Sequence, residues 1–397
     1  MISEHAPLFC QPSSIHRTVG CHGWAGLAEG VEEEVTEEIR EGLAVHWCGE
    51  QIIKAYKPNA GLGDVPMNVE MVGAKAPDGV VITEEMYDAA TTYADDVIKT
   101  VNACQMGDRL RIEQPVAMPE IHEECWGTPD AWMYDDKARH MYLWDLKYGH
   151  SSVDAYENWQ LLAYAVGALR EVTQNRPLQD FGITVTVNIV QPRCYDGQGP
   201  FRRWTFPAID LRGYVNQMEL ACAASRKPGV LVTTGPHCKN CPAMFQCPAG
   251  REAAANALEY STQSIAHNPS NVALAYEMSM LARAEDALKF RREAIQADAM
   301  ARIKAGESIP GYAMEQGYGR SKWLHSDDEV LAMGTVMGVD LHAPSKPLSP
   351  AQARDKFKKH SIDPAVISSY YGNQPTSMKL VVDDGTKAKR IFSGEKL

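Results

Sequence analysis

Apolar and polar residues alternate along the middle of the chain in a pattern that predicts a sheet with helices between its strands. Alternating runs bounded by turn residues predict five strands, at residues 109–117, 127–134, 142–148, 183–191 and 202–206. Apolar residues at helical spacing predict helices at residues 26–56, 83–104, 154–170 and 210–224, with Thr83 as the N-cap of the second. This order of helices and strands is typical of an α/β fold with a mixed central sheet flanked by helices.

The composition changes past residue 255, which predicts a core domain at residues 1–255 and a mostly helical accessory region at residues 256–397. Residues 270–305 predict one long helix with large aliphatic residues seven apart: Leu274, Leu281, Leu288 and Ile295. A seven-residue repeat indicates a seam against another helix, in the same domain or in a second subunit, so we expect oligomerisation through this helix as one of two outcomes. Beyond it we expect short helices at 349–359 and 364–370, a strand at 379–391 and a basic tail.

Two acidic residues and a lysine fall at one end of a predicted β-hairpin. Its arms are residues 131–134 and 141–143, so Asp130 and Asp145 come together. Lys147 is two residues further on and shares a strand face with Asp145. The carboxylates would hold a divalent metal that polarises a phosphate and lowers the pKa of a bound water, while the lysine steadies the developing charge. A D-x-K triplet is also common by chance, and such a strand is often a solvated edge.

Three other residues belong to the same hypothesis. Gln160 and Tyr164 lie four residues apart on the predicted helix at 154–170, so both side chains can lean over the end of the strand that carries Asp145. His46 lies among apolar neighbours and would, taken alone, more often be a packed core histidine than a ligand. Glu50, one turn later, is either its orienting partner or a surface acid.

In order and spacing, His46, Pro129-Asp130, Asp145-Leu146-Lys147 and Gln160-x-x-x-Tyr164 resemble the motifs of the RecB-type branch of the PD-(D/E)XK nuclease superfamily, over about residues 10–255. The resemblance implies a restriction-endonuclease-like core. It also implies that His46, Asp130, Asp145 and the carbonyl of Leu146 bind Mg²⁺ or Mn²⁺, that Lys147 places the attacking water, and that Gln160 and Tyr164 position the scissile strand.

Among the ten cysteines, Cys238-x-x-Cys241-x5-Cys247 has the close spacing of a metal site in a loop. RecB-type nucleases with an iron-sulfur cluster, including the AddB group and CRISPR-associated members, are similar in having one cysteine before the catalytic core and three after it. The resemblance implies that Cys21 is the fourth ligand of a 4Fe-4S cluster, although Cys10 competes for the place. Four thiolates also suit structural Zn²⁺.

Charge and the absence of targeting signals qualify this picture. A net charge of -12 argues against a general nucleic-acid coat, because binding to the phosphate backbone favours basic domains. The sequence shows no secretory signal and no long apolar run, so we expect a cytoplasmic protein with reduced cysteines and no membrane segment.

The sequence thus predicts a metal-dependent DNA nuclease. We expect an exonuclease that acts on single strands or duplex ends. Residues 13–21 and the Pro310-Gly311-Tyr312 stretch resemble a phage and prophage branch of these proteins, which implies a role in phage DNA replication or recombination, with such proteins as partners, in the host cytoplasm. The alternative is a non-cleaving protein of the same fold that binds DNA or recruits a partner. A restriction endonuclease would need a base-reading element, for which we find no candidate.

Overall fold

The computed structural model describes residues 6–31, 35–56, 71–105, 107–194, 199–260 and 269–313. The described residues as far as Ile309 belong to one compact unit, and a second unit begins at Pro310. The predicted elements at 349–359, 364–370 and 379–391 and the basic tail lie outside the described residues.

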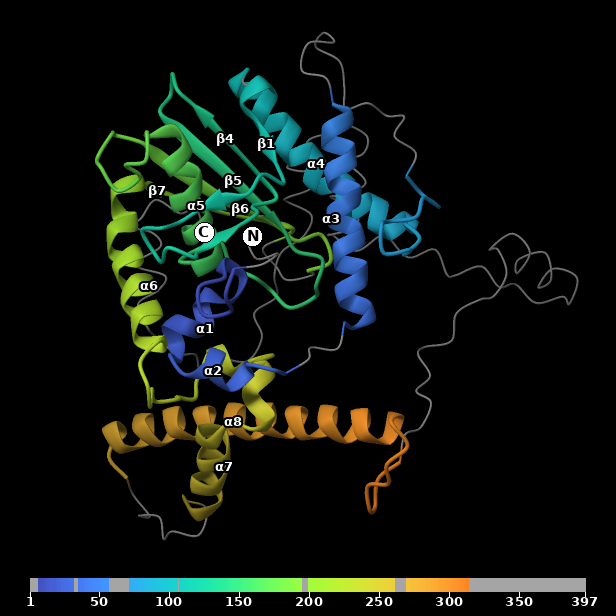
Figure 1. The fold of residues 1–397 in the computed structure, drawn as a ribbon, viewed down its shortest axis with the longest axis vertical. Coiled ribbons are helices and arrows are strands. Elements are labelled where there is room, and N and C mark those ends of the chain that lie inside the picture. Colours follow the sequence, from blue (N-terminus) through green and yellow to red (C-terminus); the bar gives the residue numbers. More distant parts are fainter. Residues whose placement is uncertain are drawn as a thin grey trace, which may run out of the picture. The chain divides into compact units, whose positions relative to one another are not determined.

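A five-stranded mixed sheet forms the centre of the first unit, in the order β1-β4-β5-β6-β7 (Figure 1). Strands β5 and β6 are parallel, and the other neighbours are antiparallel. The strands are β1 (Arg111–Ile112), β4 (Ala131–Asp135), β5 (His140–Leu146), β6 (Thr184–Val190) and β7 (Phe201–Pro207), while β2 (Val116–Ala117) and β3 (Trp126–Gly127) form a separate two-stranded sheet. The predicted mixed sheet is therefore confirmed.

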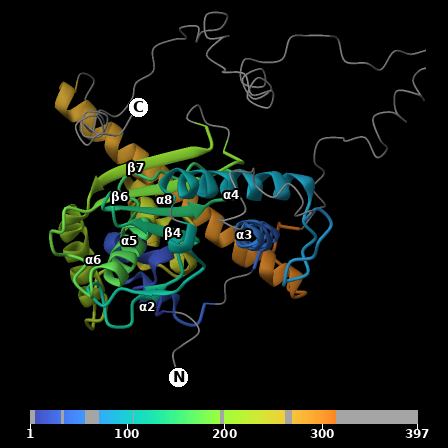
Figure 2. The same ribbon diagram turned by 90° about the horizontal axis from the view of Figure 1, so that it is seen from above.

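Helices flank the sheet, as predicted, with α3 and α4 on one side and α5 and α6 on the other (Figure 1 and Figure 2). The α-helices are α1 (Ile15–Gly20), α2 (Trp24–Ala28), α3 (Glu37–Ala55), α4 (Glu84–Cys104), α5 (Trp159–Val172), α6 (Leu211–Ser225), α7 (Pro248–Tyr260) and α8 (Asn271–Lys304). The 3-10 helices are η1 (Pro12–Ser14), η2 (Gly107–Arg109), η3 (Ala208–Asp210), η4 (Pro236–Cys238) and η5 (Pro242–Phe245). In the described part of the chain, every helix is too short or too polar to cross a membrane.

Alternation along β5 builds a core on each face of the sheet. Met141 and Leu143 belong to the core under α5 and α6, whereas Trp144 and Leu146 belong to the core under α3 and α4. Asp145 lies two residues after Leu143 on β5, so both side chains are on the same face of the sheet, the face covered by α5. The parallel β5–α5–β6 crossover therefore places the start of α5 over the end of the strand that carries Asp145.

Two helix predictions need correction. The single helix predicted at 26–56 is wrong: α2 ends at Ala28, Gly30 adopts a left-handed backbone at φ +76°, and Thr36 caps α3 by accepting a hydrogen bond from the Ile39 amide. The helix predicted from residue 154 begins at Trp159, because the Asn158 side chain caps it by accepting hydrogen bonds from the amides of Gln160 and Leu161. The helix predictions at 83–104 and 270–305 are confirmed, with Thr83 and Ser270 as N-caps.

The strand predicted at 109–117 is also wrong as one element. It breaks at Glu113, whose φ of 49° is left-handed, and β1 and β2 on either side belong to different sheets. The amide of Glu113 donates to the carbonyl of Asp130 at 3.1 Å. The register that pairs Ile112 with Ala131 therefore brings Glu113 opposite Asp130, at the point where β1 ends.

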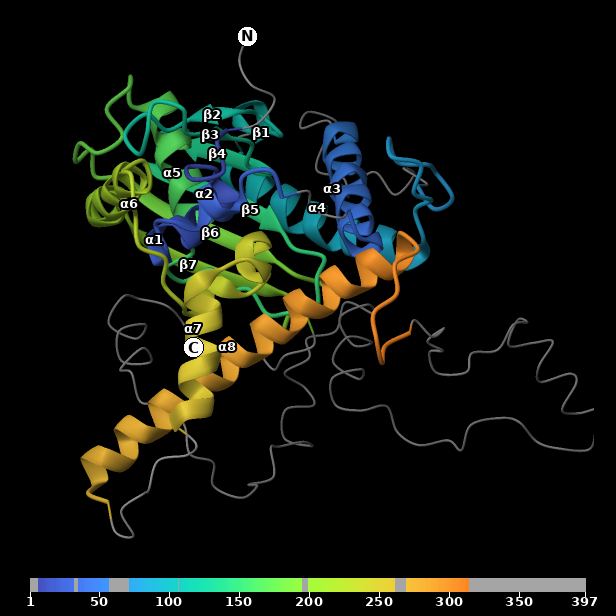
Figure 3. The same cartoon turned by 60° about the horizontal axis from the view of Figure 1, so that its bottom comes forward.

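Helix α8 packs against α7 and the cysteine loop through only part of its length (Figure 3). Its buried residues are Ala287 and Phe290, and Phe290 contacts the cluster formed by Cys238, Met244 and Cys247. The heptad residues are exposed by 44% at Leu274, 50% at Leu281, 41% at Leu288 and 44% at Ile295. The predicted seam is therefore left largely uncovered by the described part of the chain.

Candidate active site and cysteine centre

Asp130 and Asp145 come together because of the hairpin register. Ala131 pairs with Trp144, so Asp130 and Asp145 are the next opposed positions along the two chains. The amide of Leu146 donates to Oδ2 of Asp130 at 2.6 Å. Leu146, whose carbonyl was expected to bind metal, thus anchors the first carboxylate through its amide, and the role of its carbonyl stays a prediction.

Lys147 lies between the second carboxylate and helix α5. Its Nζ donates to Oδ1 of Asp145 at 3.1 Å and to Oε1 of Gln160 at 3.0 Å. Oδ2 of Asp145 lies 2.8 Å from the same nitrogen, but it is buried and forms no hydrogen bond of acceptable geometry among the described residues. A buried carboxylate oxygen left in this way has a free lone pair for a cation or a proton.

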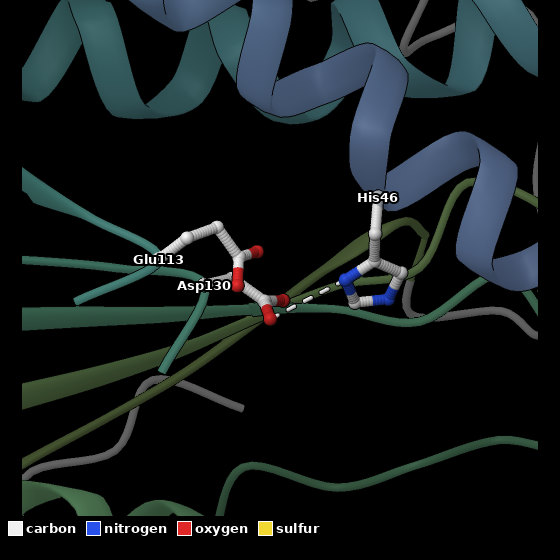
Figure 4. Close-up of side chains that lie close together, drawn as sticks. All are labelled: His46, Glu113 and Asp130. Atoms are coloured by element: carbon white, nitrogen blue, oxygen red, sulfur yellow. Dashed lines mark ion pairs between the residues drawn. The ribbon is translucent and has the colours of Figure 1, made fainter. Parts of the chain in front are cut away.

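His46 comes from α3 and meets Asp130 from the other side. Its Nδ1 lies 3.3 Å from Oδ1 of Asp130, and Glu113 completes a group whose ligand atoms lie within 4.8 Å of one another (Figure 4). Asp145 lies outside this group of three, and Glu50 pairs with Lys54. Sequence reasoning missed Glu113, because it placed the residue inside a continuous strand. The available signal was the pairing of the strand at 109–117 with the hairpin, which brings this acid opposite Asp130.

The charges of the site interact strongly. Burial alone would lower the pKa of His46, but the Asp130 carboxylate raises it to about 9. Burial opposes ionisation of Asp130 as well, yet His46 and the Leu146 amide hold its pKa below the ordinary value. Burial, with Asp130 adding to it, raises the pKa of Glu113 to about 7. For Asp145, burial raises the pKa even though Lys147 opposes the shift. The site thus carries more acid than its own cations neutralise.

Tyr164, the other predicted strand-positioning residue, lies at the same end of α5 but is packed rather than open. It is 7% exposed, and a Cβ at Gly127 would lie 3.0 Å from its ring and 3.0 Å from Pro12. Burial and the nearby charge of Asp145 raise its pKa. Glycine at position 127 is therefore what allows η1, β3 and α5 to meet beside the carboxylates.

The four cysteines suggested for a metal cluster line one cavity. Cys21 follows α1, and Cys238, Cys241 and Cys247 come from the loop that contains η4 and η5. Backbone amides point at three of the thiols: Thr233 N lies 3.3 Å from Sγ of Cys21, Gly235 N lies 3.4 Å from Sγ of Cys238, and Gly250 N lies 3.4 Å from Sγ of Cys247. Such donors stabilise thiolates, so this cavity suits a bound metal centre.

Cys10, the competing fourth ligand, lies elsewhere. Its carbonyl accepts from the thiol of Cys125, and the thiol of Cys222 lies 3.5 Å from the Phe9 carbonyl, all within the core under α5 and α6. The structure therefore places Cys21, and not Cys10, with the three loop cysteines.

Close backbone approaches hold the N-terminal segment against the cysteine loop. A Cβ at Gly20 would lie 2.3 Å from the His237 ring, and one at Gly235 would lie 2.9 Å from the same ring. Hydrogen bonds to Cys21 and Cys238 raise the pKa of His237 to about 10. The two glycines thus create the slot in which this imidazole reaches both thiols.

Helix α1 lies between the carboxylate site and the four clustered cysteines. It packs against α5 on one side and η4 on the other, and Cys21 follows its last residue. Burial, followed by the nearby charges of Arg17, His237 and Lys147, lowers the pKa of His16 to about 4. His16 is therefore held among cations that extend from Lys147 to the cysteine loop.

The sequence matches a family described as Protein of unknown function (DUF2800) over residues 5–387. The chain belongs to this family. The matched region includes the β4–β5 hairpin, the loop with Cys238, Cys241 and Cys247, and α8, so both the carboxylate site and the cysteines lie inside it.

Proposed function

We propose that this DUF2800 protein is a divalent-metal-dependent DNA nuclease with a PD-(D/E)XK core, acting as an exonuclease on single strands or duplex ends. The observation that carries the proposal is the bridge from Asp145 through Lys147 to Gln160, formed beside the His46–Asp130 pair. Four sequence motifs separated by up to 114 positions, from His46 to Gln160, thus converge on one end of one hairpin. A solvated strand edge does not require that convergence. Function in phage replication or recombination rests on the sequence resemblance.

The arrangement of elements is compatible with that core. The hairpin β4–β5 carries both acids, α5 follows it, and β6 returns parallel to β5. Helix α3 supplies His46 from the opposite face. These are the elements that the RecB-type resemblance requires, in the same order.

The donor set fits Mg²⁺ or Mn²⁺. Asp130, Glu113 and His46 would hold a cation, together with the Asp145 carboxylate, because these are hard oxygen donors and one imidazole. When bound, such a cation supplies Lewis-acid polarisation of a phosphate and an activated water. Lys147 places positive charge where the phosphate oxygens gather negative charge, and Gln160 fixes the direction of that ammonium. Tyr164, which is almost completely buried beside the carboxylates, would help to position the DNA strand by packing behind the residues that contact it.

The cysteine cavity supports a 4Fe-4S cluster better than zinc. A tetrahedral zinc site with Zn–S bonds of about 2.3 Å brings its sulfurs to roughly 3.8 Å from one another. No three of the described cysteine Sγ atoms lie within 4.8 Å of one another, a wider spacing than that of a closed zinc site. Its role would be to hold α1 and α2 against the loop that contains η4 and η5.

The test is cleavage of end-labelled DNA by protein purified without oxygen. With Mn²⁺ or Mg²⁺ we expect shortening of single-stranded DNA or of duplex ends, with mononucleotides or short oligonucleotides as products. With EDTA we expect none, because the phosphate is not polarised without the cation. A protein that bound DNA without cleaving it under any of these conditions would instead be the non-cleaving relative of the same fold.

Mn²⁺ affinity should rise with pH, because binding must displace the proton from His46. Its pKa is raised from the ordinary 6.5 to about 9, so we expect about a tenfold gain in affinity per pH unit between roughly pH 7 and 8.5. Glu113, at about 7, should steepen the dependence below that range. Anaerobic calorimetry at several pH values measures the slope.

The stability of the metal-free protein should depend on pH in the opposite direction: it should fall as the pH rises. The His46–Asp130 pair contributes stability that is fully present below pH 6.5 and is lost as the pH rises through about 9. His46→Gln should flatten both profiles. An affinity that did not depend on pH in the wild-type protein would exclude His46 as a ligand.

A further inference from the structure

Tyr93 on α4 has a buried hydroxyl without a hydrogen-bond partner in the described chain. The residue is 2% exposed, and its Oη is fully enclosed. A buried hydroxyl normally finds an acceptor, since leaving it unpaired destabilises the fold. The exception therefore needs an explanation.

The ring of Tyr93 packs against α3 beside Gly49, which lies one helical turn after His46. A Cβ at Gly49 would lie 2.9 Å from Cδ1 of Tyr93, so the absence of a side chain at Gly49 lets the ring enter between the helices. Tyr93 belongs to the buried cluster that contains Val45, Ala131 and Trp144, the chain neighbours of His46, Asp130 and Asp145.

A second contact fixes this face of α4 over the strand ends. Asp96, three residues after Tyr93, accepts a hydrogen bond of 3.0 Å from the indole of Trp144, the residue before Asp145. Burial, and then the negative charges of Asp130, Glu113, Asp145 and Glu50, raise the pKa of Tyr93 well above its ordinary value. The hydroxyl thus stays protonated, as a donor, within the electrostatic field of these carboxylates.

We propose that Tyr93 is a positioning residue of the cation site, whose hydroxyl donates a hydrogen bond to a water that enters with the hydrated cation. This inference rests on the cation site of the proposed function. Mg²⁺ and Mn²⁺ keep several of their waters in protein sites, and an oxygen-rich site of this kind holds them where a donor can reach. The hydroxyl would thereby orient that water without binding the metal.

The test is Tyr93→Phe, which removes only the hydroxyl. In EDTA its melting temperature should equal or exceed that of the wild-type protein, because an unpaired buried polar group is lost. Its affinity for Mn²⁺, measured by anaerobic calorimetry, should fall by about 3- to 10-fold, as expected for the loss of one hydrogen bond. A residue with only a structural role would not give this pair of opposite effects.

Tyr87→Phe is the matched control, since Tyr87 lies on the same helix and packs against the same core. It should leave Mn²⁺ affinity unchanged. Unchanged Mn²⁺ affinity in Tyr93→Phe, or a lower melting temperature in EDTA, would overturn the proposal. Cleavage of DNA by the wild-type protein tests the nuclease proposal separately. If the wild-type protein binds Mn²⁺ but cuts no DNA, the nuclease proposal is wrong, whereas the proposal for Tyr93 still holds.

Discussion

Lys147→Ala should reduce DNA cleavage by at least about 100-fold, the usual cost of removing one group that stabilises charge in a transition state. Its ammonium contacts both Asp145 and Gln160, so the substitution removes the positive charge and the link to α5 together. The measurement is the rate of release of end label under saturating Mn²⁺. The control is Lys99→Ala, whose side chain is 76% exposed and pairs with Asp95 on the outside of α4.

Stability and catalysis must be separated in this experiment. Lys147→Ala leaves the buried carboxylate of Asp145 without its cation, which should destabilise the fold by about 1 to 3 kcal/mol. Adding Asp145→Asn removes the uncompensated charge, so the double variant should regain stability while staying inactive. Regained stability in the double variant would confirm that the cost of Lys147→Ala comes from the uncompensated charge, and its inactivity would follow from the loss of Asp145 alone. Near wild-type cleavage by Lys147→Ala would end the catalytic assignment of Lys147.

Cys241→Ser should bleach the protein and weaken its fold. Anaerobically purified wild-type protein should be brown, with broad absorption at about 400 nm, and contain iron and sulfide. Without one ligand the centre should be lost or unstable, and the melting temperature should fall by at least roughly 5 °C, because α1, α2 and α8 all pack against this loop. Metal analysis and thermal unfolding measure the two effects.

Cys104→Ser is the matched control for the cysteine centre. Cys104 ends α4, is half-buried and lies outside the cavity, so its variant should keep the colour and the iron content. A colourless wild-type protein with one zinc per chain would refute the iron assignment but keep the four ligands. A wild-type protein free of both metals when prepared without oxygen or chelator would refute the centre itself.

The parts of the site that sequence reasoning found are those set by short-range geometry. Asp145 and Lys147 share a face because a strand repeats every two residues, and a hairpin brings Asp130 to the same end. Gln160 follows from helical spacing. Each of these inferences needs only a periodicity and one turn.

The parts that it missed depend on local backbone exceptions or on tertiary packing. The left-handed backbone at Glu113 ends β1, and the strand pattern does not predict that break. The sequence favours Cys21 but leaves Cys10 in competition, because only tertiary packing decides which of the two meets a loop more than 200 residues away. Gly49 and Tyr93 look like ordinary helical residues until α3 and α4 are seen in contact.

The contacts between the N-terminal segment and residues near the cysteine loop can form only late in translation. The contact between Cys21 and Thr233 spans 212 residues, and the contact between Phe9 and Cys222 spans 213. At about 5 to 20 residues per second, a ribosome needs roughly 10 to 40 s to make that stretch. During this time Cys21 lacks its partner Thr233, whereas Cys10 meets Cys125 after only 115 residues. The proposed cluster could be inserted only after Cys247 has emerged from the ribosome, because Cys247 is the last of its four cysteines in the sequence.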